Sequence, residues 1–188
     1  TLFPYTTLFR SEYADWNSQA KIGYGCAPTG STSAVRTQGY TDAMVYHTGT
    51  DQVSRTTYGG TQYRHIEGLW DNCYDWCDGI YFSTADVYII NNPANFSDTT
   101  GGTRVGARAT TGADIKSFFV PSVTGLEWAL YPDETISDSN YETYVCDYCD
   151  YNASGVVLYV GGYYGQGQVL GAFYLNGNST ASHSGTNV

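Results

Sequence analysis

Residues 155–175 read GVVLYVGGYYGQGQVLGAFYL and contain two near-continuous apolar runs, at 155–160 and 169–175. Runs of this kind are typical of strands that are covered on both faces. The glycine-rich connection at 161–167 predicts that the two strands pair as a hairpin. We therefore expect both strands near the centre of a β-sheet.

The rest of the chain supports an all-β fold. Short apolar or alternating segments recur between clusters of Gly, Asn, Asp and Thr, and helical periodicity is nearly absent. About a dozen strands in a chain of this size favour an antiparallel two-sheet β-sandwich or jelly roll. The expected strands are residues 20–25, 43–48, 52–58, 62–67, 79–83, 86–91, 103–109, 115–120, 126–131, 142–147, 155–161 and 168–175.

The domain organisation follows from the same pattern. Residues 12–175 are expected to form one domain, and the polar segment near 93–102 is either a long loop or a boundary between two lobes. Residues 176–188 lack periodicity and predict a flexible tail. Residues 1–11, TLFPYTTLFRS, resemble one reading frame of a common short-read sequencing adapter, and we expect them not to belong to the fold.

Charge restricts the partners. The 188 residues include 8 Lys+Arg and 18 Asp+Glu, which gives a net charge of −10. Nucleic acid and anionic membranes both require clustered basic residues, so neither is an expected partner. No run of about 18 apolar residues is present, and we expect no membrane span.

Three Asn-x-Ser/Thr acceptors predict covalent N-glycans, at Asn95, Asn152 and Asn178. Each acceptor lies in a stretch rich in turn residues, where a glycan can project into solvent. Together with the scarcity of lysine, they indicate a secreted or cell-surface protein.

Five cysteines include two close pairs, Cys73 with Cys77 and Cys146 with Cys149. Four thiolates in this spacing are compatible with a zinc site. Neighbouring carboxylates and the predicted extracellular location favour disulfides, within the pairs or between them. Cys26 is the odd thiol, and we expect it to bond another chain or a residue outside this sequence.

No catalytic motif stands out. His65 and Glu67 share one strand face, which is more typical of a structural pair than of acid–base chemistry. Glu127, Glu142 and Asp86 are candidate carboxylates for glycoside hydrolysis, which requires two of them on opposite sides of a sugar. The expectation is that the protein is not an enzyme.

Two acidic clusters suit calcium by ligand type but lack EF-hand spacing. We interpret them as solubilising turns and expect no cofactor and no metal site. They consist of Asp71, Asp75 and Asp78, and of Asp133, Glu134 and Asp138.

Aromatic residues are the remaining signal. The chain holds 19 Tyr, more than a core of this size is expected to bury, so we expect exposed tyrosine patches at an interface. The candidate interface or glycan-platform residues are Trp70, Trp76, Trp128, Tyr163 and Tyr164.

These features lead to three hypotheses. The first is a secreted, glycosylated structural subunit that assembles into a homo-oligomer or helical polymer, an extracellular fibril or filament. Strand addition between copies would build it, with the segment before Cys26 as the donor. The second is a carbohydrate-binding β-sandwich module. The third is a small glycoside hydrolase.

Overall fold

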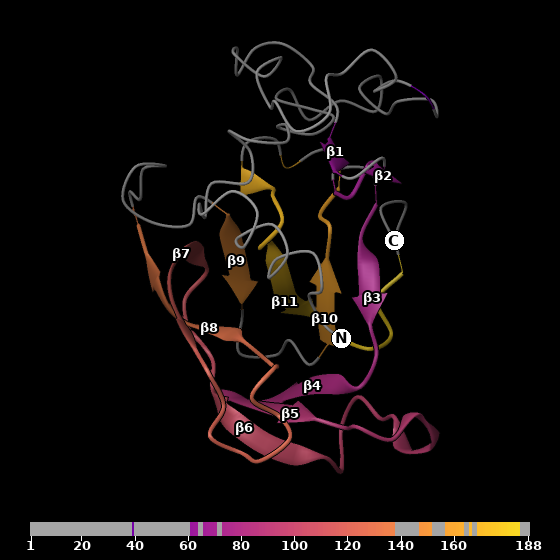
Figure 1. Ribbon diagram of the computed structural model, residues 1–188, viewed down its shortest axis with the longest axis vertical. Helices are drawn as coiled ribbons and strands as arrows, with labels where there is room; N and C mark the ends of the chain where they lie inside the picture. The colour runs from indigo at the N-terminus through magenta and orange to yellow at the C-terminus, as the bar shows by residue number, and fades with distance from the viewer. Residues whose placement is uncertain are drawn as a thin grey trace.

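The computed structural model describes residues 39, 61–63, 66–70, 73–137, 147–151, 157–163, 166 and 169–184. Within these residues the chain forms eleven strands and one short 3₁₀ helix (Figure 1). The structure therefore confirms the all-β fold class.

The strands form three sheets. The largest contains six strands, which are, in spatial order, β3 (Asp75–Cys77), β10 (Val157–Val160), β11 (Leu175–Ser179), β9 (Tyr148–Tyr151), β7 (Ala113–Phe119) and β8 (Tyr131–Ile136). The second contains β4 (Ile80–Ser83), β5 (Asp86–Ile89) and β6 (Thr103–Ala107). The third is a short hairpin of β1 (Gln62–Tyr63) and β2 (Ile66–Glu67).

The six-stranded sheet is mixed. Strands β9 and β11 run parallel, with Leu175 opposite Cys149, whereas every other pair in the sheet is antiparallel. The prediction of a purely antiparallel arrangement is wrong for this pair. The chain leaves β9, forms β10, and then reverses to return as β11 in the position between them, so β11 runs in the same direction as β9.

The hairpin expected at 155–175 is present with a different second strand. β10 pairs antiparallel with β11, and Val160 lies opposite Leu175. The apolar run at 169–174 is not a strand but a turn, in which Leu170 and Phe173 are buried. β11 instead continues through Ser179, so the first residues of the expected tail belong to the sheet.

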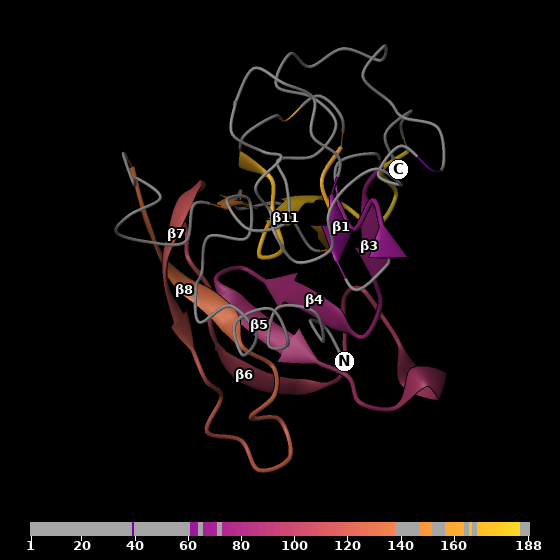
Figure 2. The same ribbon diagram turned by 45° about the horizontal axis from the view of Figure 1, so that its top comes forward.

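Strands β4, β5 and β6 form a meander (Figure 2). A two-residue turn, Thr84 and Ala85, joins β4 to β5, and Thr84 has the positive φ of 57° that such turns require. The segment 93–102 connects β5 to β6, and these two strands pair directly across it. That segment is therefore the connection of a hairpin within one sheet.

The remaining strand predictions divide into three groups. The predicted segments 79–83, 86–91, 103–109 and 115–120 overlap β4, β5, β6 and β7. Of the predicted segment 62–67, residues 62–63 and 66–67 form the paired strands β1 and β2. Residues 126–130 form a turn that leads into β8, and β3 was not predicted. Segments 20–25, 43–48 and 52–58, and all of 142–147 except Asp147, lie outside the described residues, as do residues 1–11.

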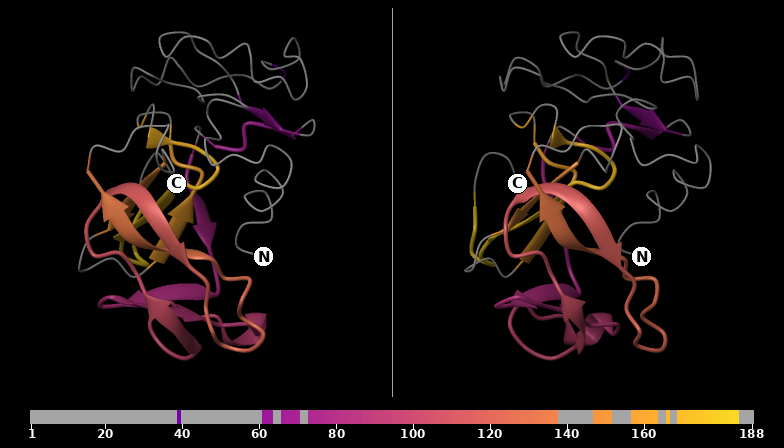
Figure 3. Two further views of the ribbon diagram at one scale, coloured as in Figure 1. Left: turned by 60° about the vertical axis from the view of Figure 1, so that its left-hand side comes forward. Right: turned by 90° about the vertical axis from the view of Figure 1, so that its left-hand side faces the viewer.

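One hydrophobic cluster joins the two larger sheets. The three-stranded sheet contributes Ile80, Phe82, Val87, Ile89 and Val105, and the six-stranded sheet contributes Ile115, Tyr131, Cys149, Tyr151, Leu158 and Leu175. The three-stranded sheet lies across one end of the larger sheet in Figure 1, and the loop between β7 and β8 extends down beside it in both views of Figure 3.

Candidate functional site

A cavity of about 380 Å³ lies beside the three-stranded sheet. Its wall combines the turn between β3 and β4, the end of β5, the 3₁₀ helix η3 (Pro93–Asn95) with Phe96, and Trp128 from the loop between β7 and β8. Its volume falls within the range of about 300–1,000 Å³ that is usual for small-molecule sites. Three separate segments of the chain, 77–79, 89–96 and the loop with Trp128, therefore meet at one concave surface.

Phe96 is held at the cavity by the turn that precedes it. The Asn92 side chain accepts a hydrogen bond from the Ala94 amide (3.1 Å), and the Phe96 amide donates to the Pro93 carbonyl (3.3 Å). The ring then packs against Gly79, where an added Cβ would lie only 2.7 Å from Phe96 Cε1. Gly79 thus provides the space that the Phe96 ring occupies.

Trp128 belongs to a turn that is anchored on its inner side by the buried residues Leu126 and Ala129. The Ala129 amide donates to the Leu126 carbonyl (3.0 Å), and the Trp128 indole N–H donates to the Gly125 carbonyl (2.9 Å). The indole orientation is therefore set by its own turn, and the ring remains 44% exposed.

The polar groups of the cavity are few. Asp78 and Asn91 line it and are exposed to solvent. The Cys77 thiol also lines it, and burial, followed by the charges of Asp75 and Asp78, raises the pKa of Cys77 to about 12. The thiol is therefore protonated at neutral pH, so Cys77 does not act as a nucleophile. The cavity offers a ligand hydrogen-bonding groups and the faces of aromatic rings.

The five predicted platform residues do not form one surface. Trp128 lines the cavity, whereas Trp76, 42% exposed, lies on β3 with its ring edge against Tyr159 at 4.5 Å between centroids. Trp70 is 3% exposed and belongs to the core. Tyr163 is half-buried against Tyr74, and Tyr164 lies outside the described residues.

The expected exposed tyrosine patch is not found in the described part of the chain, where every tyrosine is buried or half-buried. Several of their hydroxyl groups find hydrogen-bond partners inside the fold, which offsets the penalty for burying them. Asn176, for example, donates to both the Tyr74 hydroxyl (3.2 Å) and the Tyr174 hydroxyl (3.3 Å), and Tyr81 donates to the Gly101 carbonyl (2.7 Å).

The cysteines of the described chain are free. Cys73 is exposed, Cys77 is partly buried and Cys149 is buried, and no disulfide links them. Strands β10 and β11 separate Cys77 from Cys149, a span of about 14 Å along the sheet at about 4.8 Å per strand. A disulfide requires Cα atoms within about 7 Å, so neither a Cys77–Cys149 bond nor a shared zinc site forms. Cys26 and Cys146 lie outside the described residues.

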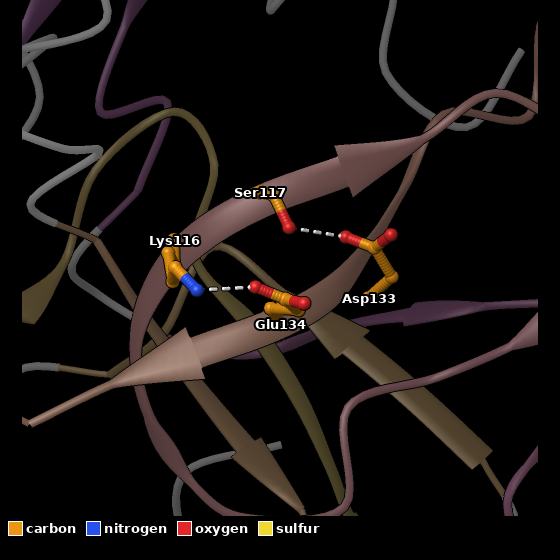
Figure 4. A network of polar contacts seen from close by, with 4 residues as sticks. All are labelled: Lys116, Ser117, Asp133 and Glu134. Atoms are coloured by element: carbon orange, nitrogen blue, oxygen red, sulfur yellow. Dashed lines mark hydrogen bonds and ion pairs between the residues drawn. The ribbon is translucent and has the colours of Figure 1, made fainter.

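A second, polar groove of about 530 Å³ runs along β7 and β8. Lys116 Nζ donates to Glu134 (2.5 Å), and Ser117 Oγ donates to Asp133 (2.6 Å), side by side across the two strands (Figure 4). Both carboxylates belong to the second acidic cluster, and these internal contacts occupy them. Asp138 of this cluster and Asp71 of the first cluster lie outside the described residues. No metal-binding group of three His, Cys, Asp or Glu residues occurs among the described residues.

The catalytic candidates are dispersed. Asp86 forms a surface ion pair with Arg104 (2.7 Å), and the Glu127 carboxylate accepts a hydrogen bond from the Gly125 amide (2.8 Å). The Glu67 carboxylate accepts from the Gly39 amide (2.7 Å). His65 and Glu142 lie outside the described residues, so the pair of His65 and Glu67 is not complete there.

Two predicted glycosylation sites are described, and both are exposed. Asn95 ends the 3₁₀ helix immediately before Phe96. Asn178 lies in β11, where its side-chain amide donates a hydrogen bond to the Asp150 carboxylate (3.1 Å). Asn152 lies outside the described residues.

The sequence prediction found Trp128 but missed Phe96, Asp78 and Asn91. An isolated aromatic residue in a polar loop, directly after a proline-containing turn, was the available signal for Phe96. Comparison of the chain with known protein families, with curated proteins and with solved structures found no match. No helix of the described residues has the length and apolar character needed to cross a membrane.

Proposed function

We propose that the domain is a carbohydrate-binding module and that its site is the cavity bordered by Phe96 and Trp128. The observation that carries this proposal is the presence of two aromatic side chains, 42% and 44% exposed, at the same cavity. Large apolar rings are normally buried in a protein, so two of them at one concave surface indicate a ligand that covers them.

A sugar ring suits this chemistry because it combines an apolar C–H face with hydroxyl groups around its edge. The rings of Phe96 and Trp128 provide surfaces for the C–H face. Asp78 accepts hydrogen bonds from hydroxyls, and Asn91 both donates and accepts them. Few polar groups in a mainly apolar cavity are the usual composition of an orienting site.

We also infer that the two larger sheets together form a β-sandwich, the fold expected of such a module. The support is the single hydrophobic cluster to which both sheets contribute, with Phe82 and Val87 on one side and Leu158 and Leu175 on the other. The cavity then lies at one end of the sandwich, where loops from both sheets meet.

The test is a matched pair of tryptophan substitutions. Trp128→Ala should weaken saccharide binding by about 10- to 100-fold, because the lost stacking surface is worth about 1–3 kcal/mol. Trp76→Ala removes an equally exposed indole that does not line the cavity and should leave affinity unchanged. Binding is measured by screening an immobilised glycan panel and by titration calorimetry on the best ligand.

The proposal fails if no glycan binds the folded protein, or if the two substitutions weaken binding equally. Thermal unfolding of each variant confirms that it is folded. Because Asn95 stands next to Phe96, the screen uses protein with Asn95→Gln as well as the unaltered chain, so that a covalent glycan does not occupy the cavity.

A second candidate is the secreted structural subunit that assembles by strand addition, and the edge of the three-stranded sheet favours it. β6 pairs with β5 alone among the described strands, and Thr103, Arg104 and Ala107 of this strand are exposed. An unpaired strand edge is a template for a segment of a neighbouring copy. By contrast, β8, an edge strand of the six-stranded sheet, carries Pro132 and a register shift, both of which hinder pairing.

Ala107→Lys tests this second candidate, because a charged side chain on an edge strand opposes the addition of another strand. We expect the substitution to abolish filaments that the unaltered protein forms, as seen by negative-stain microscopy and light scattering. Thr99→Lys adds the same charge in the exposed loop and should leave assembly intact. A protein that is monomeric at all concentrations, or filaments that persist in Ala107→Lys, would rule out assembly through β6.

A further inference from the structure

The charges around the cavity are of one sign. Among the described residues, Asp78 is the only charged residue that lines it. Glu127 and Asp75, which are close in sequence to Trp128 and Cys77 of the wall, add further negative charge. Of the described residues, no Lys or Arg lines the cavity. A ligand in contact with Phe96 and Trp128 therefore meets a negative potential that no Lys or Arg of the described residues offsets within the cavity wall.

The basic residues of the described chain are engaged elsewhere. Arg104 contacts Asp86 at 2.7 Å, and Lys116 contacts Glu134 on the strands of the other sheet. Arg108 is 5% exposed and lies in the core over two aromatic rings, at 4.6 and 5.1 Å from their centroids. None of the three has a side chain in the wall of the cavity.

The negative potential extends to the buried part of the cavity wall. After burial itself, the charges of Asp75 and Asp78 are the causes that raise the pKa of the Cys77 thiol to about 12. Asp78 therefore acts electrostatically on a group inside the cavity while its own carboxylate remains exposed. A ligand placed against the same wall is subject to the same charge.

We propose that Asp78 makes the site selective by charge, so that it takes a neutral or amine-bearing saccharide and rejects uronic, sialic and sulfated sugars. This inference rests on the proposed carbohydrate-binding function. A carboxylate on the ligand would be repelled by Asp78, whereas an ammonium group would be attracted to it. Neutral rings depend on stacking and hydroxyl contacts alone.

The experiment compares three sugars with the same ring and different charge: glucose, glucosamine and glucuronate, as methyl glycosides or as the terminal units of matched oligosaccharides. Titrations use the full chain at constant ionic strength and at pH 6, where the carboxylates are ionised and the amine is protonated. The unaltered protein should bind glucuronate at least about tenfold more weakly than glucose, and glucosamine at least as tightly as glucose.

Asp78→Asn should remove this discrimination. We expect the ratio of its affinities for glucose and glucuronate to fall about tenfold, and its preference for glucosamine over glucose to disappear. Asp98→Asn removes the same charge from a loop residue that does not line the cavity and should leave all three affinities unchanged. Because Asp78 raises the pKa of the Cys77 thiol, Asp78→Asn should lower this pKa and speed the alkylation of Cys77. Faster alkylation would confirm that the negative potential at the cavity has decreased.

Each outcome decides one of the two proposals. Equal binding of glucose and glucuronate, or a preference that Asp78→Asn does not alter, overturns the charge selectivity. In that case a loss of all binding in Trp128→Ala would still support the carbohydrate site. If no sugar of any charge binds the folded protein, both proposals are overturned.

Discussion

At the scale of single residues, the candidate site depends on glycines as much as on the aromatic rings. Gly79 has a φ of 80°, which strains any residue with a Cβ, and the Phe96 ring fills the space where that Cβ would be. Gly177 in β11 is similarly enclosed, with the rings of Phe82 and Tyr151 within 2.6–2.7 Å of an added Cβ. Aromatic packing of this kind leaves no room for even one additional carbon.

We predict that Gly79→Ala lowers the free energy of unfolding by about 2–4 kcal/mol, because left-handed strain and overpacking add together. The displaced Phe96 should also abolish saccharide binding. Gly101→Ala is the matched control, since Gly101 has a φ of 84° but nothing within 4 Å of an added Cβ. It should cost only the strain, about 1–2 kcal/mol. Equal losses in urea unfolding would show that the contact with Phe96 is not tight.

At the scale of elements, local sequence predicted strands well where polar and apolar residues alternate on a meander. Strands β4, β5 and β6 form this meander, and their partners are close in the chain. The errors lie at apolar runs that turned out to be turns. Leu126 and Leu170 are as apolar as strand residues, but they anchor turns to the core. Periodicity alone does not separate a buried turn from a buried strand.

The strand β11 shows the opposite error. Its sequence LNGNS predicts a loop, yet it lies between β10 and β9 in the six-stranded sheet. Asn176 is 6% exposed there because Tyr74 and Tyr174 accept its hydrogen bonds. Such a strand is stabilised by contacts about 100 residues apart in the chain, which no local pattern contains.

At the scale of the whole molecule, the shared core places ionisable groups where water does not reach. Burial raises the pKa of Cys149 to about 12, and it raises the pKa of Tyr131 and Tyr151 well above their ordinary values. In the unfolded chain these groups ionise at ordinary values, 9.0 for the thiol and 10.0 for tyrosine. The unfolded state therefore releases protons first as the pH rises.

We predict that the contribution of these buried groups to stability is constant below about pH 9, and that it makes stability fall between pH 9 and 12. Each thiol or phenol that ionises only when unfolded lowers the free energy of unfolding by up to about 1.4 kcal/mol per pH unit. Urea unfolding under reducing conditions, at intervals from pH 7 to 11, measures the slope. Cys149→Ala should make the slope shallower, whereas Cys73→Ala, at an exposed position, should not. An unchanged slope in Cys149→Ala would contradict the burial of this thiol.

The sequence by itself determined the fold class, the approximate positions of the strands of the three-stranded sheet and one residue of the candidate site, Trp128. The alternation of polar and apolar side chains and the positions of turn residues are local properties, so the sequence alone is enough to recognise them. The tertiary structure alone decided the parallel pairing of β11 with β9, the separation of Cys77 from Cys149, and the cavity itself. All three features depend on which distant segments of the chain pack together, as the segments that carry Asp78, Phe96 and Trp128 do. Hydrophobic contacts hold such segments together, and because these contacts are not directional, the local sequence contains no signal for them.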